Sequence, residues 1–107
     1  MEPNQILCVT TTLPSKESAD ALADALVRKR LVACVQVQGP ISSTYHWRGI
    51  LEHAEEWLCV AKTDGKHFEL LKTAILEQHT YDEPEIVATE IVAGSATYLA
   101  WLRQELA

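Results

Sequence analysis

The chain has 107 residues, 48% of them hydrophobic, and a formal net charge of −6. This length suits one domain with a single core and is too short for two. The acidic balance and the lack of a lysine or arginine stripe argue against nucleic acid as a partner. The short apolar runs and an N-terminus without a signal-peptide pattern lead us to expect a cytoplasmic protein with no membrane span.

The first part of the chain predicts a strand, a helix and a second strand. Residues 5–12 are rich in β-branched side chains and end before Pro14, which is typical of a strand. Ser15 is a good helix N-cap, and the apolar residues over 19–26 recur at helical spacing. Residues 31–38, "LVACVQVQ", predict the second strand.

The next segment predicts a long hairpin. Gly39 and Pro40 interrupt the second strand, residues 41–48 look extended again, and Gly49 supplies a turn into a third strand over 50–63. Fully extended, such strands are longer than a globule of this size, so the hairpin must bend and protrude. Its unpaired edges and its aromatic residues predict an obligate oligomer with hairpins pairing across subunits. These aromatic residues are Tyr45, Trp47 and Trp57.

The last part predicts a helix, a loop, a strand and a short helix. Asp64 is placed to cap the first of these helices. Pro84 prevents that helix from continuing through 79–85. Residues 85–93, "EIVATEIVA", predict the fourth strand, and Gly94 precedes the terminal helix.

This element order predicts an α+β fold. The sequence β-α-β-β-α-β followed by a helix is the ferredoxin-like arrangement, in one domain over residues 1–107. The sheet should be antiparallel, with both main helices on one face.

The three cysteines, Cys8, Cys34 and Cys59, lie inside apolar runs and form no C-x-x-C pair. We expect small, reduced core residues. Any role beyond packing is left open.

The stretch "HTYDEPEIV", residues 79–87, contains the first candidate site. His79, Asp82 and Glu83 could supply one nitrogen and two oxygens to Cu²⁺ or another divalent cation. One histidine makes a weak site, so the alternative is a structural loop whose acids cap it or face solvent.

Two further histidines could lie opposite each other in the hairpin. If Gly49 and Ile50 form a two-residue turn, His46 and His53 face each other with Cβ atoms roughly 5 Å apart. The pair could then hold one cation. A shift of register destroys it and leaves two surface histidines.

A mixed polar and aromatic set predicts a ligand cleft between subunits. Lys62 lies in an apolar strand and needs a partner, for which Glu85 is the candidate. The alternative is interface packing around one buried ion pair. Besides His79, the set consists of Tyr45, Trp47, Lys62, Tyr81, Glu85 and Trp101.

Catalysis has little support in the sequence. There is no glycine-rich phosphate loop and no G-x-S-x-G motif. Nothing places a nucleophile beside a base. We therefore expect a protein that is not an enzyme.

Three blocks resemble the CutA family of divalent-cation tolerance proteins. They are "ACVQVQGPISSTYHWRGILE", "LCVAKT" and "HTYDEPEIVATEIVAGSATYLAWL", and the match covers nearly the whole chain. The resemblance implies a ferredoxin-like homotrimer, PII-like in architecture, with intersubunit strand pairing. It also implies a role in tolerance of copper and other divalent cations.

The chain departs from the family pattern at several positions. Gln38, Ile50 and Thr80 stand where the family usually has proline, lysine and proline. The resemblance places the family's proposed copper-ligand cysteine at Thr11 and an additional histidine at Gln78. Of the metal ligands that the resemblance implies, only His79 is matched.

These observations leave three hypotheses. The first is a divalent-cation response protein with weak ion binding in a subunit cleft near His79. The second is a PII-like sensor or scaffold that binds a small ligand or a protein partner without metal chemistry. The third is a small hydrolase or transferase.

Overall fold

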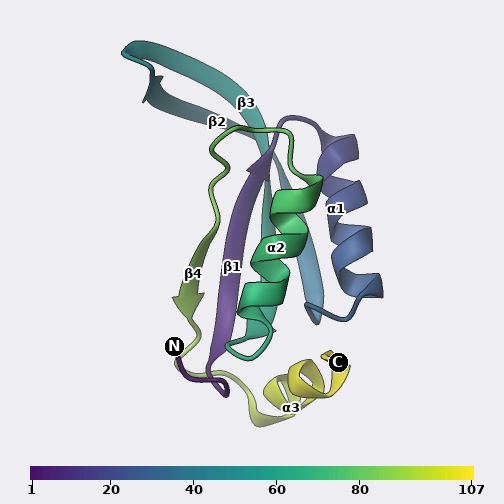
Figure 1. Ribbon diagram of the computed structural model, residues 1–107. Coiled ribbons are helices and arrows are strands. Elements are labelled where there is room, and N and C mark those ends of the chain that lie inside the picture. The colour runs from purple at the N-terminus through teal and green to yellow at the C-terminus, as the bar shows by residue number, and fades with distance from the viewer.

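The computed structural model describes residues 1–107 and contains four strands and three helices (Figure 1). The elements are β1 (Ile6–Leu13), α1 (Lys16–Arg28), β2 (Cys34–Trp47), β3 (Ile50–Asp64), α2 (Phe68–Gln78), β4 (Val87–Glu90) and α3 (Ala96–Glu105).

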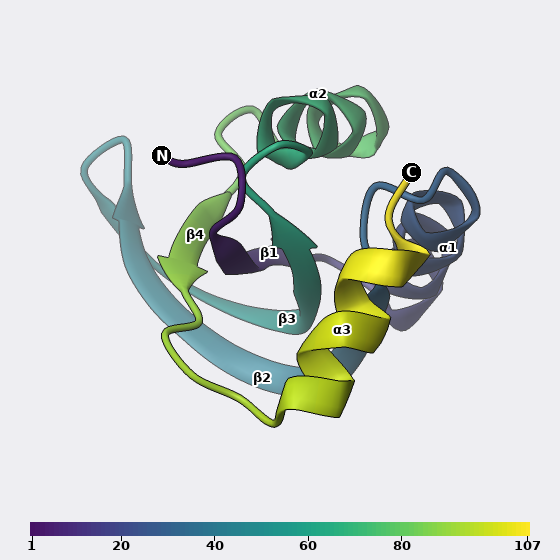
Figure 2. The ribbon, with the colours of Figure 1, turned by 90° about the horizontal axis from the view of Figure 1, so that it is seen from below.

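The strands form one antiparallel sheet in the order β2-β3-β1-β4. Helices α1 and α2 lie beside each other on one face, and α3 lies at the end of the sheet near the N-terminus (Figures 1 and 2). The predicted α+β fold with a single antiparallel sheet is therefore confirmed. No helix is long and apolar enough to span a membrane.

Helix α1 begins as the sequence predicts. The Ser15 hydroxyl accepts a hydrogen bond from the Ser18 main-chain N–H at 3.1 Å, and the Ser18 hydroxyl accepts one from Ser15 N–H at 3.3 Å. This reciprocal capping satisfies two of the main-chain donors that a helix start leaves unpaired. The helix then buries Leu22 and Leu26 against the sheet.

Helix α2 begins differently from the prediction. It starts at Phe68 with His67 at the N-cap position, so Asp64 is not the cap. The Asp64 carboxylate instead accepts from the His67 main-chain N–H at 3.0 Å and lies 2.6 Å from His67 Nδ1. The reason is that Gly65 and Lys66 form a turn before the helix, which moves its start by three residues.

Strands β2 and β3 form the long hairpin that the sequence predicts. It extends beyond the body of the molecule (Figure 1), whose longest dimension is 44 Å against 24 Å and 22 Å for the others. The pairing register shifts between Gln38 and Ile41, at the predicted break. The strand begins at Cys34 rather than residue 31, since residues 31–33 belong to the irregular connection that follows Arg30, whose φ is 57°.

The turn at the tip consists of Arg48 and Gly49, both with positive φ, and Trp47 pairs with Ile50. This register places Leu51 opposite His46. The predicted pair of facing histidines is therefore wrong.

Two of the other predictions for these strands need correction. Trp57 pairs with Leu13 in the body of the sheet and packs against the main core, so it does not belong to the hairpin tip. Strand β4 is shorter than 85–93, because only Val87–Glu90 pairs with β1.

The cysteines differ from one another in burial. Cys59 is buried among the core residues, where burial raises the pKa of its thiol to about 11. Cys8 and Cys34 are only half-buried, on the face of the sheet that α1 and α2 do not cover. The expectation of three core cysteines is thus confirmed for Cys59 alone.

Gly39, at the bend of the hairpin, lies close to the indole of Trp57. A Cβ atom at Gly39 would clash with the Trp57 ring, so Gly39→Ala forces the indole away from its packing against the core. We expect a loss of about 1–3 kcal/mol in the free energy of unfolding, as overpacked sites typically show. Chemical denaturation measures this loss. Gly49→Ala, whose Cβ would meet no atom within 4 Å, separates the strain of positive φ from overpacking.

Candidate functional site

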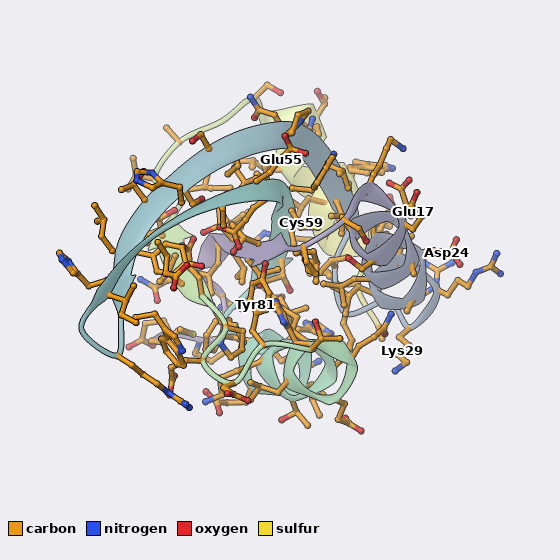
Figure 3. The ribbon with its side chains drawn as sticks, turned by 90° about the horizontal axis from the view of Figure 1, so that it is seen from above. Glu17, Asp24, Lys29, Glu55, Cys59 and Tyr81 are labelled. Atoms are coloured by element: carbon orange, nitrogen blue, oxygen red, sulfur yellow. The ribbon has the colours of Figure 1, made fainter.

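The main concave feature lies between the hairpin and the loop of residues 79–86, with a volume of about 800 Å³. We refer to it as the hairpin groove. Figure 3 shows Tyr81 inside the curve that β2 and β3 make. The lining hydroxyl groups come from Thr12, Ser43, Thr44 and Thr80. The lining aromatic residues are Tyr45, Trp47 and Tyr81.

The charge in the groove is negative. None of the residues that line it is lysine or arginine. Arg48, at the tip, has a guanidinium nitrogen 3.7 Å from an Asp82 carboxylate oxygen and is exposed. The groove therefore concentrates negative charge within a confined space. Its carboxylates are Glu52, Glu56, Asp82, Glu83 and Glu85.

The most buried of these carboxylates is Glu56 on β3. It is 6% exposed, and Tyr81 donates its phenol hydrogen to Glu56 Oε2 at 2.8 Å. Burial and the adjacent Glu56 carboxylate raise the pKa of Tyr81, which keeps the phenol protonated and donating. No other side chain or main-chain group of the chain donates to Glu56. The second Glu56 oxygen is not among the fully buried polar atoms, so it remains accessible from the groove.

His79 fixes the loop that carries Tyr81. The Tyr81 main-chain N–H donates to His79 Nδ1 at 3.2 Å, so the ring proton is on Nε2, which donates to the Thr12 main-chain oxygen at 2.8 Å. The two rings lie 4.8 Å apart. Both imidazole nitrogens are thus occupied within the chain, and His79 positions Tyr81.

The predicted metal ligands are not brought together. Asp82 is exposed and paired with Arg48, and Glu83 lies on the exposed side of the groove. No group of three or more histidine, cysteine, aspartate or glutamate side chains is close enough to hold a metal ion. Since His79 has no free nitrogen, these residues do not form a preorganised coordination shell.

Thr11 does not contribute to a metal site either. It is 2% exposed, pairs with Cys59 and lies on the same side of the sheet as the core residues Val9 and Leu13. Its hydroxyl has no hydrogen-bond partner. The position implied for a copper-ligand cysteine therefore faces away from the groove.

The predicted ligand cleft is only partly assembled. Tyr45, Trp47, Tyr81 and Glu85 line the groove, but Lys62 does not. Lys62 donates to the Gln36 side-chain oxygen at 2.9 Å, so its predicted pairing with Glu85 is wrong.

The register explains this separation. Lys62 lies in the half of β3 that pairs with Cys8, toward the end of the sheet where α3 lies. Glu85 lies beside Thr10, whose hydroxyl donates to it at 3.5 Å. Trp101 is also outside the groove, since it belongs to α3 and packs against Tyr98 at 5.6 Å between ring centroids.

Glu56 was missing from the predicted site. The available signal was its position on the same strand face as Leu58, Val60 and Lys62, directly before an apolar run. The partner that buries it, Tyr81, follows 25 residues later.

The CutA1 divalent ion tolerance protein family matches residues 7–105 of the chain. The chain belongs to this family. The divalent-cation tolerance protein CutA of Thermus thermophilus is 42% identical over 96 residues, which cover 90% of this chain and 93% of that protein. The corresponding protein of Pectobacterium atrosepticum is 38% identical over 101 residues, covering 94% and 89%.

Solved structures of the family agree with the fold. The Thermus thermophilus protein superposes with a TM-score of 0.92 at 39% identity, covering 95% of this chain and 99% of that one. The structure of CutA1 from Oryza sativa gives 0.94 at 31% identity, covering 98% and 96%. The predicted resemblance to the CutA family is therefore confirmed, and the chain is a divalent-cation tolerance protein of this family.

Relatives differ in their location. The Arabidopsis thaliana relative is chloroplastic and the Archaeoglobus fulgidus structure is described as periplasmic. This chain spans 53% of the Arabidopsis thaliana protein. A cytoplasmic location for this chain stays a prediction.

Proposed function

We propose that the chain serves divalent-cation tolerance as a binding protein without catalytic activity, and that the hairpin groove is its cation site. The observation that supports this most is the charge of the groove, which has five carboxylates and no lysine or arginine among its lining residues. Such a surface attracts cations by charge before any specific contact forms.

The ion binding should be weak. Carboxylate and hydroxyl oxygens suit hard divalent ions, whereas Cu²⁺ and Zn²⁺ favour imidazole and thiolate ligands. No such ligands converge in the groove. We therefore expect dissociation constants on the order of 10⁻⁴–10⁻³ M, typical of weak carboxylate sites. Copper would be one of several divalent ions that the groove binds weakly.

We also propose a PII-like homotrimer with intersubunit strand pairing. Strands β2 and β4 form the two edges of the sheet and have unpaired main-chain groups, which favour pairing with another chain. The hairpin tip exposes Tyr45, Trp47, Ile50 and Leu51. A second subunit would cover apolar surface of the tip and form the other wall of the groove, which Tyr45 and Trp47 also line.

Trp47→Ala should weaken this assembly. Trp47 is 38% exposed in the single chain, and its indole offers a large apolar area for an interface. We expect the mass at micromolar concentration to fall from three chains toward one, as measured by light scattering. An unchanged mass would contradict the role of the hairpin tip. The same substitution of Tyr98, on α3, is the matched control.

Calorimetric titration with Mg²⁺, Zn²⁺ and Cu²⁺ tests the cation site. The double variant with Glu83→Gln and Glu85→Gln should weaken binding several-fold, because it removes two groove charges. The matched control is the double variant with Glu17→Gln and Glu55→Gln, which removes the same number of charges. Both residues are exposed and lie away from Tyr81 (Figure 3). Submicromolar binding that disappears in His79→Ala would instead place the ion at His79.

A second candidate function is a sensor or scaffold that binds a small ligand without metal chemistry. Three aromatic rings line the groove together with the carboxylates. Aromatic side chains are typical of small-molecule sites and supply no ligands to a metal ion. A ligand found in the groove of the purified protein would favour this function.

A further inference from the structure

We propose that the hairpin groove takes an organic cation, a primary ammonium or guanidinium group on a short carbon chain, with its charged head at Glu56. This inference rests on the proposed function, in which the groove binds cations, and it names the class of ligand that the groove selects. Three features of the groove support it.

The first feature is the incomplete set of partners of Glu56. Its carboxylate is 6% exposed, and Tyr81 donates to one oxygen only. The second carboxylate oxygen has no partner in the chain and is not fully buried, so a ligand in the groove can reach it. Ammonium and guanidinium groups supply several N–H donors and no lone pairs, so one head group can satisfy the second oxygen directly.

The second feature is the absence of a cation from the chain itself. Lys62 donates to Gln36, and Arg48 is held at the tip beside Asp82. Neither lines the groove. A cation that binds Glu56 therefore comes from outside this chain.

The third feature is the aromatic wall. Tyr45 and Trp47 are 44% and 38% exposed and border the groove together with Tyr81. Aromatic faces attract organic cations, which have less firmly held water than metal ions. The Arg48 guanidinium already lies 5.3 Å from the Trp47 ring centroid, so this ring accepts a group of the proposed class.

The size of the groove favours a free small molecule over a single side chain. Its volume of about 800 Å³ lies within the range of small-molecule sites, roughly 300–1,000 Å³. A single metal ion would occupy little of this space, in agreement with the weak metal binding proposed above. A lysine or arginine of a second copy is the other source of the same chemistry.

The probe is 1,4-diaminobutane, compared with neutral 1-butanol and with Mg²⁺, followed by calorimetry and side-chain NMR. We expect saturable diamine binding of one molecule per chain and none of butanol. Glu56→Gln keeps the shape and should weaken diamine binding about tenfold or more, the effect of losing one charge-assisted hydrogen bond. Glu55→Gln, the same change on an adjacent exposed residue, should leave the affinity unchanged.

The outcomes separate this inference from the proposed function. Mg²⁺ binding without diamine binding overturns the inference and leaves the cation site standing. Diamine binding that needs Glu56, without metal binding, supports the inference and overturns the metal role. Binding of neither overturns both.

Three further results decide the remaining cases. Equal diamine affinity in Glu56→Gln overturns the inference. If Glu56→Gln does not fold, Glu52→Gln replaces it, and a severalfold weaker affinity is the expected result. Diamine binding that appears only in a monomeric Leu51→Glu protein, whose groove lining is unchanged, means that a second copy fills the site, which overturns the small-molecule assignment.

Discussion

Replacing His67 by alanine is expected to lower the free energy of unfolding by about 2–4 kcal/mol, because its buried contact with Asp64 and its part-buried contact with Ala107 are lost. The imidazole is 5% exposed and connects two segments of the chain. Its Nδ1 lies 2.6 Å from an Asp64 carboxylate oxygen, and its Nε2 lies 2.8 Å from the main-chain oxygen of Ala107. Alanine would leave the nearly buried Asp64 with one main-chain donor.

Urea denaturation of the variant measures this loss. Hydrogen exchange should also become faster in α3, because the Ala107 contact helps to hold the segment that follows this helix. His46→Ala is the matched control, since His46 is exposed in the hairpin and its removal should change stability by less than about 0.5 kcal/mol. Equal stability of the two variants would show that the His67 bridge contributes nothing.

Leu71→Ala is expected to lower the free energy of unfolding by about 2–5 kcal/mol, the range for deleting a fully buried leucine. Leu71 is 0% exposed and belongs to the main core cluster together with Val9, Leu22 and Ile75. Helix α2 leads directly into His79, so the packing of this helix also anchors the loop that carries Tyr81.

The adjacent Leu70 provides the control. It is 62% exposed on the other side of α2, and Leu70→Ala should change stability by no more than about 0.5 kcal/mol. Thermal unfolding of both variants, compared with the unchanged chain, measures the difference. Similar melting temperatures for the two variants would contradict the assignment of Leu71 to the core.

The sequence was most informative where local chemistry determines structure. Ser15 caps α1 because its hydroxyl meets main-chain donors within three residues. The order of elements and the protruding hairpin also followed from patterns within single segments. Such signals involve neighbouring residues, and tertiary packing changes them little.

The hairpin register could not be predicted in the same way. A turn at Gly49 and Ile50 uses the one glycine of the tip, but the observed turn also places Arg48 at φ 51°. Non-glycine residues adopt this conformation rarely, so backbone preferences favoured a turn at Gly49 and Ile50 over the observed turn. The difference moves every cross-strand partner by two residues and separates His46 from His53.

The candidate site was predicted in its loop and aromatic residues but not at its centre. Glu56 is charged and begins an apolar run, which is typical of an exposed strand end. Its hydrogen-bond partner, Tyr81, is on a loop distant in sequence. In the same way, the separation of Lys62 from Glu85 depends on the register between strands, which residue types alone do not specify.

Paramagnetic broadening of NMR signals by Mn²⁺ tests cation binding in the hairpin groove most directly, because it locates the ion on the chain. We expect the amide signals of Thr44, Tyr81 and Glu83, which line the groove, to broaden first and together. Signals of Cys34 and Lys62, which lie outside it, should stay sharp. Broadening that begins at Cys34 and Lys62, or that spreads evenly over exposed carboxylates, would contradict a cation site in the groove.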